Sequence, residues 1–177
     1  MRKIRYVLFD LNGTLTDPGE GITNSVAYAL EKLGIAPPER KELYKFIGPP
    51  LRESFIEYYG LTPENAQKGV IFYREYFDAT GIFQNLPYPD AYLALKRLKN
   101  EGYVLILATS KPESAAKRIL DKFEMAEYFD YVCGADLSGN LTKKDDVIRY
   151  AMYAANIADA NSAVMVGDRK HDVYGAA

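Results

Sequence analysis

The sequence has little of three features that would each indicate a class of protein. It has one cysteine, Cys133, so no disulfide can form within the chain, and we expect a reducing, cytoplasmic compartment. Its 22 basic and 24 acidic residues leave a net charge of -2, which gives no electrostatic footprint for nucleic acid or an anionic membrane. The apolar stretch behind the basic N-terminus is about five residues long, which is too short for a signal peptide or a membrane span.

The sequence does contain enough apolar material for a buried core. Hydrophobic residues make up 48% of the 177, and this length suits one domain or a core with a small insert. No internal repeat or low-complexity tract is present. We therefore expect a globular protein without nucleic-acid or membrane partners, either a monomer or a homodimer.

The first part of the chain changes from a strand pattern to helical patterns. Residues 4–9 read as a continuous apolar strand, as in a central strand that is covered on both faces. From residue 20 to 34 apolar residues recur at helical spacing, and Gly34 ends the pattern. Further helices are predicted at 38–47, 50–59 and 63–80. Because residues 18–85 carry no strong strand signal, we predict that they form a helical insert.

After a loop-like segment at 85–89, strand and helix patterns alternate. Helices are predicted at 89–101, 112–122 and 144–155, and strands at 103–108, 131–133 and 163–166. This alternation indicates an α/β domain with a parallel sheet. We therefore expect one core made of residues 1–17 and 86–177, interrupted by the insert at 18–85.

Side chains that can carry chemistry stand where the predicted strands end. They are Asp10, Thr109, Ser110, Asp168 and Asp172, with Lys143 and Lys144 at the start of the helix before the last strand. In parallel sheets ligands bind beyond the carboxyl ends of the strands, so we expect these side chains to share one edge.

Such a set suits phosphoryl transfer, in which the protein mainly positions groups and neutralises charge. Carboxylates hold Mg²⁺, one carboxylate can attack phosphorus, and a hydroxyl and an ammonium can hold phosphate oxygens. Each residue alone has a structural explanation: a strand-end Asp can cap a turn, Thr109 can cap the next helix, and paired lysines are usually solvated. The ordered combination favours a phosphoryl-transfer site.

The same residues give the chain a resemblance to a known family. It resembles the haloacid dehalogenase-like hydrolase superfamily, in the phosphoglycolate phosphatase-like group, over essentially its whole length. The family's first motif, Asp-x-Asp-Gly-Thr-Leu-x-Asp, is matched except at position 12 by Asp10-Leu11-Asn12-Gly13-Thr14-Leu15-Thr16-Asp17. The other motifs are matched by Thr109-Ser110-Lys111-Pro112, by Lys144 with Lys143 as a near competitor, and by Gly167-Asp168 with Asp172. This resemblance implies a Rossmann-like sheet with a small helical cap.

The resemblance also implies a metal site and a reaction. Asp10 would be the nucleophile and a Mg²⁺ ligand, and Asn12 would lend its backbone carbonyl to the metal. Asp168 would contact the metal, and Asp172 would support that site. The implied activity is hydrolysis of a small phosphorylated metabolite through an aspartyl-phosphate on Asp10, with phosphoglycolate, a nucleoside monophosphate and pyrophosphate as candidate substrates.

Further residues would bind the substrate. Thr109 and Lys144 would hold the transferring phosphate, and the backbone amides at Asn12 and Ser110 could add donors. In the cap, Glu20 and Arg52 are candidates for contact with the rest of the substrate. We expect the single histidine, His171, to be a solvent-facing turn residue, and Cys133 to be a buried strand residue.

Asn12 is a departure from the family. The matching Asp of family phosphatases protonates the leaving oxygen and then activates water, and such acid–base help is typically worth about 10²–10⁴-fold. Asparagine cannot titrate, so we expect an impaired phosphatase, whether through an engineered change, natural loss of activity, a sequence error or another proton path. The alternative is a catalytically silent phosphate or metabolite binder. A phospho-acceptor module is disfavoured by the helical insert and the Gly-Asp-x-x-x-Asp motif.

The end of the chain is a second departure. It stops at Gly175-Ala176-Ala177, just inside the helix after the fourth motif, whereas the family continues through another strand and helix. We expect a truncated form or an incomplete gene model, with a domain-swapped or partner-completed form as the less favoured alternative. Without the missing strand and helix, one sheet edge and one helix face would lack cover, which is an association hazard.

Overall fold

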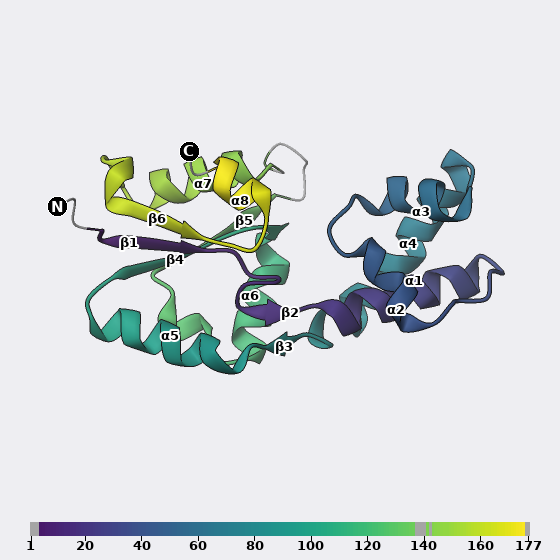
Figure 1. The fold of residues 1–177 in the computed structure, drawn as a ribbon, viewed down its shortest axis with the longest axis horizontal. Coiled ribbons are helices and arrows are strands. Elements are labelled where there is room, and N and C mark those ends of the chain that lie inside the picture. The colour runs from purple at the N-terminus through teal and green to yellow at the C-terminus, as the bar shows by residue number, and fades with distance from the viewer. Residues whose placement is uncertain (1–3, 137–140, 142, 176–177) are drawn as a thin grey trace. The chain divides into compact units, whose positions relative to one another are not determined.

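A computed structural model describes residues 4–136, 141 and 143–175. The chain divides into two compact units (Figure 1). The first comprises Met1–Asp17 and Leu86–Ala177, and is called the sheet unit below. The second comprises Pro18–Asn85 and is called the helical unit. No helix among the described residues combines the length and the apolar character that crossing a membrane requires.

The sheet unit is built on one sheet of parallel strands. In spatial order these are β5 (Tyr131–Ala135), β4 (Val104–Pro112), β1 (Tyr6–Phe9) and β6 (Ala163–Val166). Every neighbouring pair is parallel. The predicted α/β class with a parallel sheet is therefore confirmed. The apolar side chains of β1 suit its central place, because a strand covered on both faces has no polar side.

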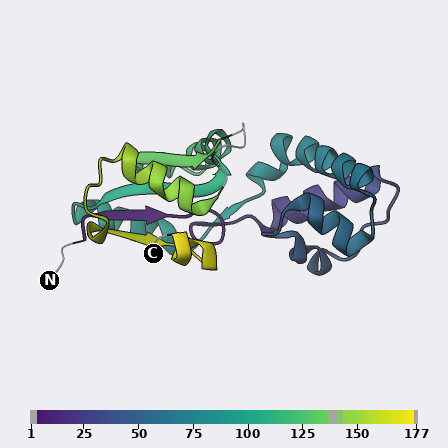
Figure 2. The same cartoon turned by 90° about the horizontal axis from the view of Figure 1, so that it is seen from above.

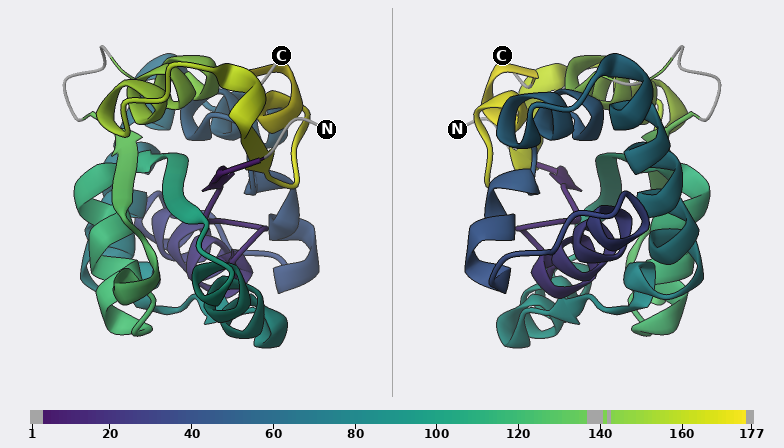
Figure 3. Two further views of the ribbon diagram at one scale, coloured as in Figure 1. Left: turned by 90° about the vertical axis from the view of Figure 1, so that its left-hand side faces the viewer. Right: turned by 90° about the vertical axis from the view of Figure 1, so that its right-hand side faces the viewer.

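Helices cover both faces of this sheet. They are α5 (Pro89–Asn100), α6 (Glu113–Lys122), α7 (Lys144–Ala154) and α8 (Lys170–Gly175), with 3-10 turns at Ala126–Tyr128 and Ala160–Ser162. Figures 1 and 3 show α5 and α7 on opposite faces. Buried apolar residues of α7, among them Val147 and Ala151, pack with Leu8 of β1 and Ile106 of β4. This packing fixes where the first residue of α7 lies relative to the strand ends.

The strand predicted at 103–108 is longer in the structure. β4 continues through Thr109 to Pro112, with an irregular register against β5 between these two residues, and α6 begins at Glu113. Pro112 has φ -51° and ψ 133°, an extended conformation from which the helix starts. The prediction ended the strand early because polar residues follow the apolar run, although the backbone remains extended through them.

The prediction of a loop at 85–89 is wrong for two of its residues, which form a short strand. β3 (Leu86–Pro87) pairs antiparallel with β2 (Thr16–Asp17), and the Tyr88 N–H donates to the Leu15 carbonyl at 3.0 Å. A two-residue strand that contains proline is too short to show an alternating pattern. This ladder pairs the segment in which the chain leaves the sheet unit with the segment in which it returns.

The helical unit contains helices and 3-10 turns and, among its described residues, no strand. Its elements are α1 (Gly19–Lys32), α2 (Arg40–Leu43), η1 (Tyr44–Phe46), α3 (Leu51–Tyr59), α4 (Pro63–Ala79) and η2 (Gly81–Phe83). Figure 2 shows α1 and α4 lying along each other. Val26 and Leu30 of α1 pack with Phe46, Phe55 and Tyr73 in one buried cluster. The helix predicted at 38–47 is instead divided between α2 and η1.

Candidate active site

Asp10 lies at the carboxyl edge of the sheet, directly after β1. Phe9 pairs with Leu107 of β4 and with Val166 of β6, so the next residue along emerges between these two strands. The Asp10 N–H donates to the Val166 carbonyl at 2.9 Å, and the residue is only 8% exposed. A carboxylate at such a position is surrounded by the residues that follow β4 and β6.

Lys144 binds this carboxylate. Its Nζ lies 2.8 Å from Asp10 Oδ1 and 2.8 Å from Asp172 Oδ1, and it donates a hydrogen bond to the Ala108 carbonyl at 3.0 Å. All three charged side chains are buried, and buried charges are retained in proteins when they are paired in this way. Lys143 is exposed at the position before α7, so Lys144 is the lysine that the structure brings to Asp10.

Asp172 is fixed by the turn after β6. Its Oδ2 accepts a hydrogen bond from the Arg169 N–H at 2.9 Å, and its own N–H donates to the Arg169 carbonyl at 2.9 Å. Gly167 makes room for it, because a Cβ on Gly167 would collide with the Asp172 carboxylate carbon. Only glycine allows the backbone to pass so close to this carboxylate.

A tight turn after Asp10 brings the chain back towards Asp168. The Leu11 carbonyl accepts hydrogen bonds from the N–H groups of Leu15 at 2.9 Å and Thr16 at 3.1 Å. Gly13, with φ +84°, approaches Asp168 so closely that a Cβ would collide with its Oδ2. The turn also places the Thr14 hydroxyl 3.5 Å from Asp168 Oδ1, to which it donates.

These residues fit a divalent cation with oxygen ligands. One carboxylate oxygen from each of Asp10, Asp168 and Asp172 lies within 4.8 Å of the others. Asp10 and Asp172 are buried and Asp168 is exposed, so the cluster opens to solvent on one side. Mg²⁺ prefers oxygen ligands, keeps several waters and is usually bound by one or two carboxylates, which suits a partly open cluster.

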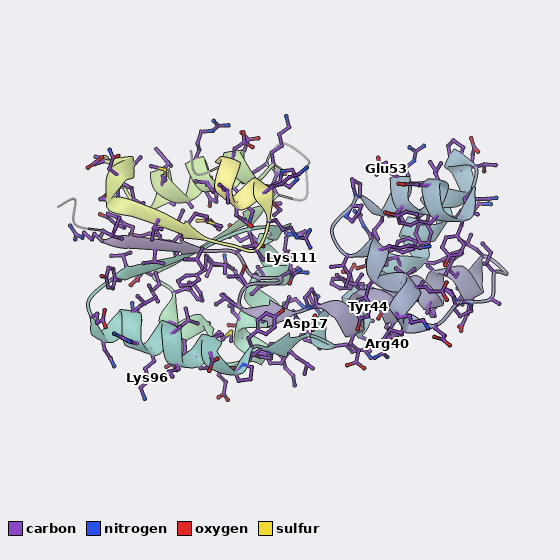
Figure 4. All side chains as sticks on the ribbon, viewed as in Figure 1. Asp17, Arg40, Tyr44, Glu53, Lys96 and Lys111 are labelled. Carbon is purple, nitrogen blue, oxygen red and sulfur yellow. The ribbon has the colours of Figure 1, made fainter. Side chains whose placement is uncertain are left out.

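Thr109 and Ser110 follow Ala108, whose carbonyl binds Lys144. Thr109 is buried, and its hydroxyl oxygen accepts the Lys111 N–H at 3.2 Å, which leaves the hydroxyl proton for donation to another group. Ser110 is exposed. Figure 4 shows the Lys111 side chain at this end of the sheet unit, whereas Lys96 lies on the outer side of α5.

Asn12 lies within the turn after Asp10. Its Oδ1 is buried without a hydrogen-bond partner in the described part of the chain, and its backbone bridges to Thr16. A buried polar atom without a partner costs free energy, and a catalytic role or contact with a bound water or ion can account for it.

Two predicted residues belong to the helical unit. Glu20 is exposed on α1, and its carboxylate lies 3.8 Å from the Arg40 guanidinium, which also donates to Asn24 Oδ1 at 3.1 Å. Arg52 is exposed on α3. Their contact with substrate stays a prediction. Arg40 was not predicted, because only the fold of the helical unit brings it to Glu20.

His171 and Cys133 lie outside this set of contacts. His171 is exposed, as expected. Burial, with the charge of Glu113 nearby, raises the pKa of the Cys133 thiol to about 11, so at neutral pH it stays protonated and is a poor nucleophile.

A cavity of about 1110 Å³ lies at the opposite edge of the sheet unit. Its lining includes Arg5, Tyr6, Tyr103, Asn156 and Ser162, which are located at the amino ends of the strands or in the segments before them. None of the three clustered carboxylates lines it. The chemistry described above therefore belongs to the carboxyl edge and not to this cavity.

Comparisons with known proteins agree on one family. The family model described as haloacid dehalogenase-like hydrolase matches residues 7–177. A protein named 5'-nucleotidase from Pseudomonas aeruginosa is 42% identical over 175 residues, which cover 98% of this chain and 79% of that protein.

Solved structures give the same result. A putative phosphatase from Clostridium difficile has a TM-score of 0.94 at 44% identity, covering 99% of this chain and 81% of that one. A predicted phosphatase from Clostridium acetobutylicum has a TM-score of 0.86 at 48% identity, covering 98% and 80%.

Proposed function

This chain belongs to the haloacid dehalogenase-like hydrolases and is a hydrolase of their phosphatase type, and from this premise we propose that it is a Mg²⁺-dependent phosphomonoesterase for a small phosphorylated metabolite. The observation that carries the proposal is the buried Lys144 ammonium between Asp10 and Asp172, with Asp168 completing the carboxylate cluster. The relative named 5'-nucleotidase and the neighbours named phosphatases support a phosphate ester as the substrate.

In the proposed reaction an Asp10 carboxylate oxygen attacks phosphorus and the bond to the ester oxygen breaks. The aspartyl-phosphate is then hydrolysed by water, which releases inorganic phosphate and restores Asp10. Lys144 holds Asp10 in position and, with the Thr109 hydroxyl, binds the phosphate oxygens. Asp10, Asp168 and the backbone carbonyl of Asn12 would hold Mg²⁺, with Asp172 supporting that site, and the ion would neutralise part of the phosphate charge.

Asn12 leaves this reaction without its proton-transfer group. A carboxyl group at position 12 could protonate the leaving oxygen and then accept a proton from the attacking water, but an amide side chain can do neither. We therefore infer that the chain binds substrate and metal but turns over slowly.

Restoring the carboxylate tests this inference. Asn12→Asp should raise the rate of Mg²⁺-dependent hydrolysis of p-nitrophenyl phosphate by at least about tenfold, since general acid–base catalysis is worth about 10²–10⁴-fold. Adding Asp10→Asn to the Asn12→Asp variant should abolish the activity and any Mg²⁺-dependent phosphorylation of the protein. Equal and substantial rates for the unmodified protein and for Asn12→Asp would contradict the role of this position.

A second candidate function is a silent phosphate or metabolite binder, which the amide at position 12 favours. It would be indicated if Asn12→Asp showed no Mg²⁺-dependent turnover while both proteins bound inorganic phosphate, measured by calorimetry. Turnover that appears only with Asn12→Asp would instead identify this chain as a phosphatase lacking its proton-transfer group.

A further inference from the structure

Arg169 contacts a carboxylate of the proposed metal site. Its Nε lies 3.7 Å from Asp168 Oδ2, and both side chains are a little more than one third exposed. Asp168 is the one exposed member of the carboxylate cluster and, unlike Asp10 and Asp172, lies outside the ion pairs of Lys144. Among the described contacts, the Arg169 guanidinium is therefore the cation that pairs with Asp168.

The backbone keeps Arg169 beside this carboxylate. Its N–H donates to Asp172 Oδ2 at 2.9 Å, and its carbonyl accepts the Asp172 N–H at 2.9 Å. The Thr14 hydroxyl donates to Asp168 Oδ1, and Gly13 closely approaches Oδ2, the same oxygen that Arg169 contacts. The carboxylate is thus confined, and the Arg169 side chain begins from a fixed point next to it.

We propose that the Arg169 guanidinium competes with the metal ion for Asp168 and thereby weakens metal binding; this rests on the function proposed above. The three clustered carboxylates and Lys144 leave a charge of -2, which Arg169 reduces to -1. A divalent cation entering the cluster meets this positive charge and must share or displace its contact with Asp168. Arg169 therefore sets the metal concentration at which the site fills.

Removing the guanidinium should tighten metal binding. In Arg169→Gln the affinity for Mn²⁺, measured by electron paramagnetic resonance of the free ion and by calorimetry, should rise about three- to tenfold at low ionic strength. The gain should shrink as salt is raised towards 1 M, because partly exposed charges are screened. A merely structural role for Arg169 predicts the opposite sign, since a disordered turn binds metal more weakly.

Two controls make the result interpretable. Lys170→Gln removes the same charge from the next residue, which is exposed, and should change Mn²⁺ affinity less than twofold. Asp168→Asn removes the contested carboxylate and should weaken Mn²⁺ binding by more than about tenfold.

Each outcome has a distinct meaning. Unchanged or weaker binding by Arg169→Gln, with Asp168→Asn impaired, would overturn the competition and leave the proposed function standing. An equal gain in Lys170→Gln would also overturn it, because the effect would then come from net charge alone. Failure of the unmodified protein and of all variants to bind Mn²⁺ would overturn the metal site and the competition together.

Discussion

Gly13 has two properties that other residues would not tolerate. Its φ of +84° disfavours any side chain, and a Cβ would collide with the Asp168 carboxylate. The first property is shared by many turn glycines and concerns stability alone. The second concerns Asp168, so it links a backbone position to the metal site.

A substitution at Gly13 should therefore have two separable effects. Gly13→Ala should cost about 1–2 kcal/mol of unfolding free energy, the usual penalty for a left-handed L-residue, and more if Asp168 cannot move away. It should also weaken Mn²⁺ binding by about tenfold or more because Asp168 must shift. Chemical denaturation and calorimetric titration with Mn²⁺ measure the two effects.

Gly102 is the matched control for this substitution. It has φ +82° and nothing within 4 Å of an added Cβ, and it lies in the same unit. Gly102→Ala should lose similar stability and keep its metal affinity. Unchanged Mn²⁺ binding in Gly13→Ala would show that Asp168 is not held as the structure indicates.

At the scale of single residues, the sequence predicts which side chains belong to the site better than it predicts which of them contact one another. The motifs indicate Asp10 and Asp168, because each comes at the end of an apolar run, and Asp172, because it lies four residues after Asp168 in the Gly-Asp-x-x-x-Asp pattern. The choice between Lys143 and Lys144 depends on the phase of α7, since neighbouring helical residues point about 100° apart. The contact of Arg169 with Asp168 depends on a turn whose hydrogen bonds to Asp172 are set only by the folded structure.

At the scale of elements, Asp130, the residue directly before β5, ties the start of that strand to α5 and β4. Its Oδ1 lies 2.8 Å from the Lys99 ammonium of α5, and its Oδ2 accepts the Leu105 N–H at 2.8 Å. Partial burial of Asp130 acts to raise its pKa, but the hydrogen bonds from Lys99 and Leu105 outweigh burial and lower it. The ionised form of Asp130 is therefore stabilised in the folded protein relative to the unfolded chain.

This lowered pKa predicts how stability depends on pH. A depressed carboxyl pKa stabilises the fold above the unfolded value near 3.9, and the contribution disappears as the pH falls through the lower folded value. Asp130→Asn should therefore cost about 0.5–1 kcal/mol at pH 7, a modest amount because the pair is partly exposed, and progressively less as the pH falls below the unfolded pKa of about 3.9.

Urea denaturation at several pH values measures the difference. Glu101→Gln is the control, because Glu101, directly after α5, pairs with Arg97 of that helix in a more exposed contact and should matter little at any pH. A cost for Asp130→Asn that is the same at pH 7 and pH 3 would mean that the charge of Asp130 is not the stabilising feature.

The predicted elements differ from the structure where local pattern and backbone disagree. The apolar run ends at Ala108, but strand geometry continues to Pro112 because β4 pairs with β5 beyond it. The β2–β3 ladder contains two residues per strand, so its pairing is defined by the neighbouring chain and not by its own composition. Long helices such as α4 were predictable because several turns repeat the same apolar spacing.

At the scale of the whole molecule, the insert at 18–85 could be predicted because its helical pattern extends over many residues. The division of the structure falls after Asp17 and before Leu86. The proposed contacts of Glu20 and Arg52 with substrate depend on side-chain directions, which the sequence pattern does not determine. The proposed phosphoryl-transfer residues, by contrast, all belong to the sheet unit.

This arrangement predicts that the sheet unit folds without the helical unit. Asp17 and Leu86 are paired across the β2–β3 ladder, so their backbones are about 5 Å apart and a turn of about four Gly and Ser residues can replace residues 18–85. Because the sheet unit has its own buried cluster, the shortened protein should unfold cooperatively and bind Mn²⁺ within about threefold of the full chain. Near-ultraviolet circular dichroism and calorimetry test this, with Asp168→Asn in the shortened protein as the control for specific binding. If the shortened protein unfolds non-cooperatively and binds a hydrophobic dye, the sheet unit depends on the helical unit for its packing. If it folds cooperatively but does not bind Mn²⁺, part of the metal site lies in the deleted residues.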